Sequence, residues 1–266
     1  MVGACCQSDS GEQIKLARQF AAEHAFAHGR TYDSYLMTED DRGYFWSEDC
    51  RSIVGYVKQG RHLHVTGNLT APESCREGFL RELVAFTNRN RFVLCIYNIF
   101  DEDLPLFSQH GFQITKWGGE PIIELRETTW TGKPYEWLRR QENRCRRLGV
   151  RLLEIDPVAP AGEVGSFIPQ MRELNEEHLR TTPQGKEMRV FEGRFIPEEL
   201  GHRRLFIAEH NGRLEAVVVL NPGLAGRMWA FDIYRRRADA PPGVIPFAML
   251  QIMRQLKQEG VEYVSL

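Results

Sequence analysis

The sequence has no long apolar run, no metal-binding pattern of cysteines and no large excess of either charge. No apolar segment approaches the roughly 20 residues of a membrane-spanning helix, so we expect only peripheral contact with a membrane. The six cysteines form neither a CxxC pair nor a Cys/His cluster, which argues against a disulfide framework and favours a reduced, cytoplasmic compartment. A formal net charge of −2 gives no bulk field for binding nucleic acid, so any basic site must be local.

The arrangement of predicted elements suggests an internal duplication. In the first half we predict helices over 11–28, 73–88 and 104–110, with strands over 44–47, 52–57, 62–66, 92–97, 112–117 and 122–125. In the second half we predict helices over 166–179 and 244–259, with strands over 205–209, 214–220, 228–233 and 261–265. The order helix, β-hairpin, strand, helix, strand occurs twice, which indicates an α/β (α+β) protein made of two similar domains.

The predicted domains are residues 1–130 and 152–266, joined by a basic helix within 131–151. The second copy ends with the strand that reaches Leu266 and has no counterpart of the last helix and strands of the first copy. We therefore expect the second domain to be truncated at its C-terminus. The alternative is that the internal symmetry is imperfect.

The connecting helix, predicted over 133–148, is rich in arginine. Arg140, Arg144, Arg147 and Arg151 follow at steps of four, three and four, so they share one face if the last turn remains helical. Because guanidinium groups bind phosphates in a bidentate manner, this helix is a candidate site for a tRNA acceptor stem or an anionic lipid head group. The candidate phosphate-binding residues are Arg139, Arg140, Arg144 and Arg147. The alternative is a solvated helix face that only keeps the protein soluble.

A second candidate site follows the predicted strand 228–233. Asp232 lies at its end and Arg235 follows in the loop. Transfer of an acyl group to a hydroxyl needs a group that accepts or orients the hydroxyl proton and a charge that stabilises the oxyanion, roles that these two residues suit. The alternative is an Asp/Arg pair that holds the loop. His62 and His64 share a strand face but have no third ligand, so we expect no metal site.

Several stretches in order resemble the C-terminal catalytic domain of bacterial phosphatidylglycerol lysyltransferases, the multiple peptide resistance factor family. They are YFWSE at 44–48, GRHLHVTG at 60–67, DLPLF at 103–107, GGE at 118–120, KEMRVFEGRF at 186–195, DIYRR at 232–236 and DAPPG at 239–243. The resemblance implies tandem GNAT-like folds and transfer of an aminoacyl group from aminoacyl-tRNA to a lipid hydroxyl, that of phosphatidylglycerol. It implies catalytic roles for Asp232 and Arg235, and substrate-binding roles for Lys186, Glu192, Arg194 and Arg236.

The donor is expected to differ from that of CoA-dependent GNAT enzymes. The R/Q-x-x-G-x-G/A phosphate cradle is missing from both halves, and an aminoacyl ester is already activated, so we expect no organic cofactor and no metal. The partners are then aminoacyl-tRNA and a membrane lipid met at the inner face of the membrane. Two alternatives stay open: another acceptor, such as a peptidoglycan precursor, a sterol or a glycolipid, or a non-catalytic module that binds RNA or lipid. The sequence does not indicate which amino acid is carried or the oligomeric state.

Overall fold

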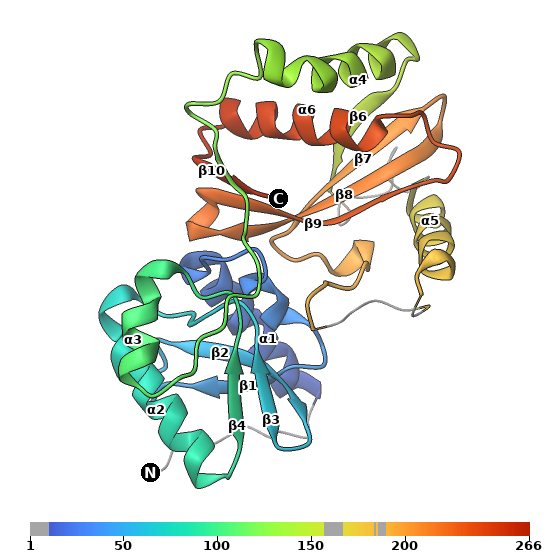
Figure 1. Ribbon diagram of the computed structural model, residues 1–266. Coiled ribbons are helices and arrows are strands. Elements are labelled where there is room, and N and C mark those ends of the chain that lie inside the picture. Colours follow the sequence, from blue (N-terminus) through green and yellow to red (C-terminus); the bar gives the residue numbers. More distant parts are fainter. Residues whose placement is uncertain (1–10, 157–166, 184, 186–189) are drawn as a thin grey trace. The chain divides into compact units, whose positions relative to one another are not determined.

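The computed structural model describes residues 11–156, 167–183, 185 and 190–266, and it divides the chain into two compact units (Figure 1). Unit 1 comprises the chain up to Glu120 together with Pro222–Gly226, and unit 2 comprises Pro121–Asn221 and Arg227–Leu266. The predicted boundary after residue 130 differs from this division, because residues 121–130 lie with unit 2. Among the described residues, no helix combines the length and the apolar character needed to span a bilayer.

Unit 1 is a four-stranded sheet with helices on both faces. Its strands are β1 (Gly43–Trp46), β2 (Ile53–Gln59), β3 (His62–Val65) and β4 (Val93–Ile96), in that order, and only β3 and β4 are parallel. Apolar residues of α2 (Arg76–Arg89) and α3 (Leu104–Gln109) pack with Val54 and Val65 on one face. Residues of α1 (Gly11–His28) and the 3₁₀ helix η1 (Ser34–Thr38) pack with Ile53. Since Ile53 and Val54 are neighbours in β2, their side chains point to opposite faces.

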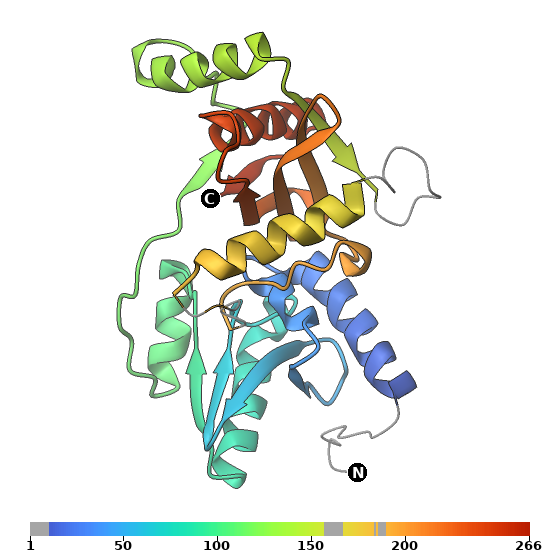
Figure 2. The ribbon, with the colours of Figure 1, turned by 90° about the vertical axis from the view of Figure 1, so that its right-hand side faces the viewer.

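Unit 2 is a six-stranded sheet in the order β5-β10-β9-β8-β7-β6. The strands are β5 (Ile122–Glu124), β6 (Arg151–Ile155), β7 (Arg204–His210), β8 (Arg213–Gly223), β9 (Met228–Arg236) and β10 (Tyr263–Ser265). The helices are α4 (Glu136–Arg147), α5 (Phe167–Thr181) and α6 (Val244–Gln258). Apolar residues of α6 pack with Phe206, Val218 and Leu220, and those of α5 pack with Leu205, Val217 and Val219. The two helices therefore cover opposite faces of the sheet. Figures 1 and 2 show α4 packed along α6.

Local sequence signals explain why several elements form where they do. Asn211 and Gly212 both have positive φ angles, of 54° and 78°, which is the backbone of a two-residue type I′ turn and joins β7 to β8. Gly243 precedes α6 and Gly260 follows it, both with positive φ. Between them, the buried residues of α6 recur at helical spacing on the face that meets the sheet.

The structure corrects two of the predicted strands and adds a third. Residues 112–117, predicted as a strand, form no strand, and most of their side chains are exposed. The strand predicted over 122–125 is present as β5 but belongs to the second sheet, where it pairs antiparallel with β10. Strand β6 was not predicted and pairs antiparallel with β7. In each case strand formation depends on a partner that is distant in sequence.

Candidate functional site

The candidate site in unit 2 lies where β9 extends beyond its neighbour β10. The two strands are parallel, and they pair only from Met228 with Tyr263 to Ala230 with Ser265. Strand β9 then continues to Arg236. Asp232 therefore lies within the strand, not at its end as predicted, but it does lie on the stretch that has no β10 partner beside it. A strand edge of this kind gives side chains access to a ligand.

Strand β9 is irregular at Asp232. Phe231 packs in the cluster that contains α6, whereas Ile233 packs in the cluster that contains α5. Residues two apart in a regular strand point to the same face, so their packing on opposite faces requires a local irregularity of the β-bulge type. Asp232, at the centre of this irregularity, is half-buried, and Arg235 is 2 % exposed. Asp232 thus lies at the point where the apolar side chains of β9 change from one face of the sheet to the other.

The segment Glu192–Phe195 approaches β9 at this point. The Arg235 Nη2 donates a hydrogen bond to Glu192 Oε1 at 3.0 Å, and the guanidinium carbon lies 5.8 Å from the centre of the Phe195 ring. Gly193 is buried against the same strand, and a Cβ atom there would lie 2.7 Å from Asp232 Oδ2. Any larger residue at this position would require the Asp232 and Arg203 side chains to move. The structure thus brings together Asp232, Arg235 and Glu192.

Arg203 is a further site residue that the sequence did not indicate. It is 9 % exposed, and its Nη2 and Nη1 atoms would lie 2.9 and 3.0 Å from a Cβ atom at Gly193, next to the Asp232 carboxylate. Its neighbour Arg204 has a different role, because it forms ion pairs with Glu154 (2.6 Å) and Glu259 (2.5 Å). No local pattern distinguishes these two consecutive arginines, so only the three-dimensional arrangement assigns Arg203 to the site.

The other predicted substrate-binding residues lie nearby or outside the described residues. Arg194 is half-buried in the segment next to Gly193. Arg236 is exposed, and its Nη1 donates hydrogen bonds to the carbonyl oxygens of Arg237 (3.0 Å) and Ala238 (3.4 Å). Lys186 lies outside the described residues. The neighbouring Arg237 holds the loop to α5, since its Nη2 lies 2.8 Å from Glu173 Oε2.

The N-terminus of α6 follows the loop after β9 and has few free amide groups. The Val244 N–H donates to Pro241 O at 3.1 Å, and the Phe247 N–H donates to Gly243 O at 2.9 Å. Pro246 has no N–H. Of the first four helical positions only Ile245 keeps an amide for a ligand, whereas a pyrophosphate cradle uses several. Any phosphate near this helix start must therefore be bound mainly by side chains.

The basic helix α4 presents four of its arginines to solvent along a shallow groove, and one of them, Arg146, pairs with Glu142 at 2.9 Å. Arg140, Arg144 and Arg147 are exposed and line, with the 56 % exposed Trp137, a groove of about 710 Å³. The helix ends at Arg147, and Arg151 lies in β6, where its Nη2 is 2.8 Å from Glu209 Oε2. The predicted row of four arginines is therefore a row of three.

Two other charged residues of α4 form hydrogen bonds that hold the helix in place within unit 2. Arg139 Nη1 donates to the carbonyl oxygens of Trp130 (3.2 Å) and Gly132 (2.8 Å), which fixes the start of the helix. Glu142 is buried and accepts hydrogen bonds from Arg254 and Gln251 of α6. Burial opposes ionisation of Glu142, but these hydrogen bonds outweigh it and lower its pKa. A buried ionised group thus ties α4 to α6.

Comparisons with known proteins identify the family. The chain matches the family described as phosphatidylglycerol lysyltransferase, C-terminal, over residues 22–266. The chain belongs to this family. The phosphatidylglycerol lysyltransferases of Bacillus subtilis and Staphylococcus epidermidis are 26 % and 25 % identical to it, over 85 % and 88 % of its length. The chain spans about a quarter of the length of these relatives, 26 % and 27 %.

The fold of this phosphatidylglycerol lysyltransferase family member is shared with a solved structure. The structure of L-PGS from Bacillus licheniformis aligns with a TM-score of 0.82 and 21 % identity, and the alignment covers 100 % of this chain and 77 % of that chain. The two-sheet α/β architecture that the sequence predicted is thereby confirmed, together with the family resemblance. The stretches that carry this resemblance lie in both units and include those that contain Asp232 and Gly193.

Unit 1 of this family member contains a buried carboxyl group of its own. Asp33 is fully buried, and its carboxylate accepts hydrogen bonds from Thr31 Oγ1 and Asn98 Nδ2, each at 2.7 Å. Burial, with a contribution from the negative charge of Glu120, raises the pKa of Asp33 from 3.8 to about 7 despite these hydrogen bonds. The Thr31 hydroxyl also lies 2.9 Å from Ser34 Oγ, so the hydrogen bonds around Asp33 continue to Ser34.

The described residues of the two units do not assemble a group that could hold a metal ion. Among residues 11–156, 167–183, 185 and 190–266, no three His, Cys, Asp or Glu side chains converge on one point. His64 Nδ1 instead lies 2.9 Å from the hydroxyl of Tyr97.

Proposed function

We propose that the chain transfers an aminoacyl group from aminoacyl-tRNA to a hydroxyl of phosphatidylglycerol at the cytoplasmic face of the membrane. The observation that carries this proposal is the cluster at β9, where a half-buried carboxylate, Asp232, lies beside the buried Arg203, and the buried Arg235 follows three residues later in the same strand. Membership of the phosphatidylglycerol lysyltransferase family supports the choice of acceptor.

In the proposed reaction, the lipid hydroxyl oxygen attacks the carbonyl carbon of the aminoacyl ester. Asp232 accepts or orients the hydroxyl proton, which is the role of a general base. Arg235 stabilises the negative charge that develops on the carbonyl oxygen, and its hydrogen bond to Glu192 holds it in place. The ester C–O bond then breaks, and the terminal ribose hydroxyl of the tRNA leaves with the proton. The reaction exchanges one ester for another, so it needs no redox partner.

The role proposed for α4 is to bind the phosphates of the tRNA. Exposed Arg140, Arg144 and Arg147 occur on one helix of a chain whose net charge is −2. Arginine suits phosphate recognition because its planar N–H groups match two phosphate oxygens. The position of Arg139, which bonds main-chain oxygens at the helix start, supports a structural contribution in place of direct phosphate contact.

A transfer assay tests this function. The purified chain is incubated with total tRNA charged with radiolabelled amino acids and with vesicles that contain phosphatidylglycerol, and label is counted in the organic phase. We expect label in the lipid product, its loss after ribonuclease treatment, and no label when phosphatidylglycerol is left out of the vesicles.

Other outcomes of this assay identify the alternatives. If label appears only when a sterol, a glycolipid or a peptidoglycan precursor is added, the donor is aminoacyl-tRNA as proposed but the acceptor is the added compound. Binding of charged tRNA and vesicles without transfer to any acceptor would identify a non-catalytic binding module and contradict the proposal.

A further inference from the structure

A cavity of about 410 Å³ lies in unit 2 between the last turn of α5 and the end of β9. His178 and Thr181 of α5 form one side, and Tyr234, Arg235 and Arg236 of β9 form the other. Arg235 is placed by its ion pair with Glu192, whose carboxylate offsets its charge. The reaction proposed above gives no role to Tyr234, and it leaves the ligand of Arg236 unspecified.

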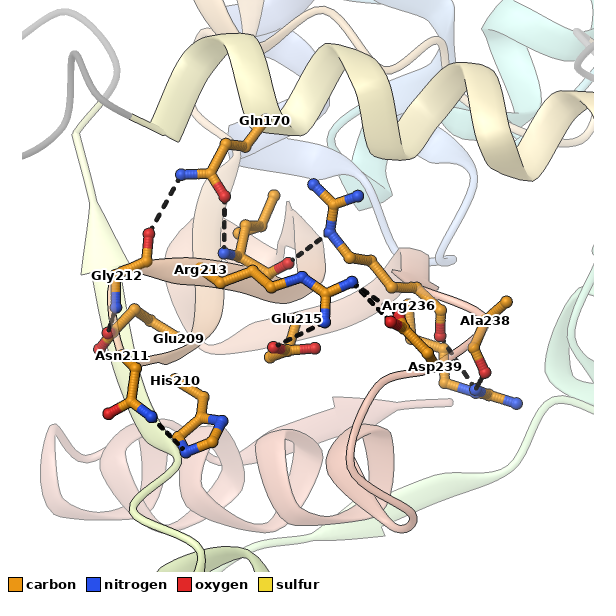
Figure 3. Close-up of polar contacts among 12 residues, drawn as sticks. Gln170, Glu209, His210, Asn211, Gly212, Arg213, Glu215, Arg236, Ala238 and Asp239 are labelled. Atoms are coloured by element: carbon orange, nitrogen blue, oxygen red, sulfur yellow. Dashed lines mark hydrogen bonds and ion pairs between the residues drawn. The ribbon is translucent and has the colours of Figure 1, made fainter.

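Arg236 is held in place by the backbone that follows it. Its Nη1 donates to the carbonyl oxygens of Arg237 and Ala238, as Figure 3 shows for Ala238. That loop is itself fixed, because Arg213 Nη2 binds both oxygens of Asp239 at 2.7 and 2.9 Å (Figure 3). A cation that is already oriented loses less entropy when it binds an anion. The loop therefore prepares Arg236 for a ligand.

The rest of the Arg236 guanidinium remains available. In the part of the chain that the structure describes, its Nε and Nη2 atoms form no hydrogen bond or ion pair, and the side chain is exposed at the cavity. The edge formed by Nε and Nη2 is the one that binds two oxygens of a phosphate. Glu177, which also lines the cavity, accepts a hydrogen bond from the Ala238 N–H at 3.2 Å and lies 3.8 Å from Arg237 Nη1, so its charge is partly offset.

Tyr234 provides an aromatic surface beside this cation. It is 52 % exposed and lies on the stretch of β9 that has no β10 partner beside it. Tyr234 and Arg236 are two residues apart in β9, so they point to the same face. An exposed ring next to an oriented guanidinium is the combination that binds a base by stacking and its phosphate by hydrogen bonds.

We propose that this cavity binds a nucleoside monophosphate group, with the phosphate on Arg236 and the base on Tyr234. The inference rests on the proposed function, in which this group is the terminal nucleotide of the aminoacyl-tRNA. It adds Tyr234 as a residue that recognises the donor. Because the N-terminus of α6 has few free amide groups, a phosphate at this cavity would be bound by a side chain, as proposed for Arg236.

The test measures binding of adenosine 5′-monophosphate, glycerol 3-phosphate and inorganic phosphate by ligand-observed NMR, with no transfer reaction. The variants are Arg236→Gln, Tyr234→Ala and Tyr234→Phe, and thermal melting verifies that each folds. The matched control is Arg227→Gln, which removes an exposed arginine that precedes β9 and pairs with Glu262. We expect Arg236→Gln and Tyr234→Ala each to weaken binding of adenosine monophosphate about 10-fold. Tyr234→Phe and Arg227→Gln should have no effect.

Two results would overturn the inference. If Tyr234→Ala leaves binding of adenosine monophosphate unchanged, the cavity recognises no base. If glycerol 3-phosphate binds more tightly than adenosine monophosphate, and Arg236→Gln weakens it, the cavity holds a lipid head group. The transfer assay is independent of these measurements. If the protein transfers the aminoacyl group but the variants do not show the predicted binding pattern, only this inference is wrong. If the variants show the predicted binding pattern but no transfer occurs, the proposed function is wrong.

Discussion

Replacement of Gly193 by alanine tests the geometry of the β9 cluster. The added Cβ atom would lie 2.7 Å from Asp232 Oδ2 and 2.9 Å from Arg203 Nη2, both closer than a normal contact. The backbone at Gly193 does not have a positive φ, so alanine introduces no backbone strain there. The neighbouring side chains must therefore move, and the carboxylate proposed to act on the acceptor hydroxyl is one of them.

The expected effect on stability is small and the effect on activity is large. Alanine lowers the conformational entropy of the unfolded chain, which stabilises the protein by about 0.4–1 kcal/mol. Overpacking costs about 1–3 kcal/mol, so we expect a net loss between zero and about 2.6 kcal/mol. A displacement of a reacting group by about 1 Å can reduce the rate about 100-fold. We therefore expect kcat to fall about 10- to 100-fold.

The assay compares single-turnover transfer and urea unfolding for wild type, Gly193→Ala and Gly78→Ala. Gly78 lies in α2, and a Cβ atom there would meet no neighbour within 4 Å, so this control adds the same methyl group without a clash. Gly78→Ala should keep full activity. A Gly193→Ala protein that is stable and fully active would refute the proposed positions of Asp232 and Arg203.

Three further predictions concern charged groups. Asp33→Asn should stabilise the protein by about 2–4 kcal/mol at pH 8 and by little near pH 4, measured by urea unfolding. The reason is that the raised pKa of Asp33, about 7 when folded and 3.8 when unfolded, makes wild-type stability fall as pH rises between these values. Combined replacement of Arg140, Arg144 and Arg147 by glutamine should weaken tRNA binding and reduce the slope of log K against log salt by up to about 3. Glu142→Ala should destabilise the packing of α4 on α6 by about 1–3 kcal/mol in thermal or urea unfolding, because it leaves Arg254 without its buried partner. An unchanged pH profile, an unchanged salt slope or an unchanged melting temperature, respectively, would contradict these predictions.

Elements with strong local signals could be predicted from the sequence. The helix predicted over 11–28 has the observed bounds of α1, and the strands predicted over 205–209 and 214–220 are present as β7 and β8, joined by the Asn211-Gly212 turn. The sequence could not reveal that β5 belongs to the sheet of unit 2 and pairs with β10, because an apolar run of three or four residues does not identify the strand with which it pairs. The same limit explains the strand wrongly predicted over 112–117.

The candidate site was partly visible in the sequence. Asp232 and Arg235 are close together in one strand and carry the groups that the chemistry needs. Arg203 and Gly193 are distant from Asp232 in sequence, and their contact with it depends on the path of the backbone after α5. Arg151 was predicted to continue the row of arginines on α4, but Gly149 has a positive φ of 80° after the last helical turn, so Arg151 enters a strand. A helical spacing of charges says little once a glycine ends the helix.

The most direct test of the account compares wild type with Asp232→Asn in two parallel measurements, binding of charged tRNA and single-turnover transfer to phosphatidylglycerol. Asparagine keeps the shape of the side chain but cannot accept the hydroxyl proton as a carboxylate does. The account predicts equal tRNA binding by both proteins, with transfer by wild type and a loss of at least about 100-fold in the variant. Equal transfer rates for the two proteins would contradict the central claim that Asp232 acts on the acceptor hydroxyl.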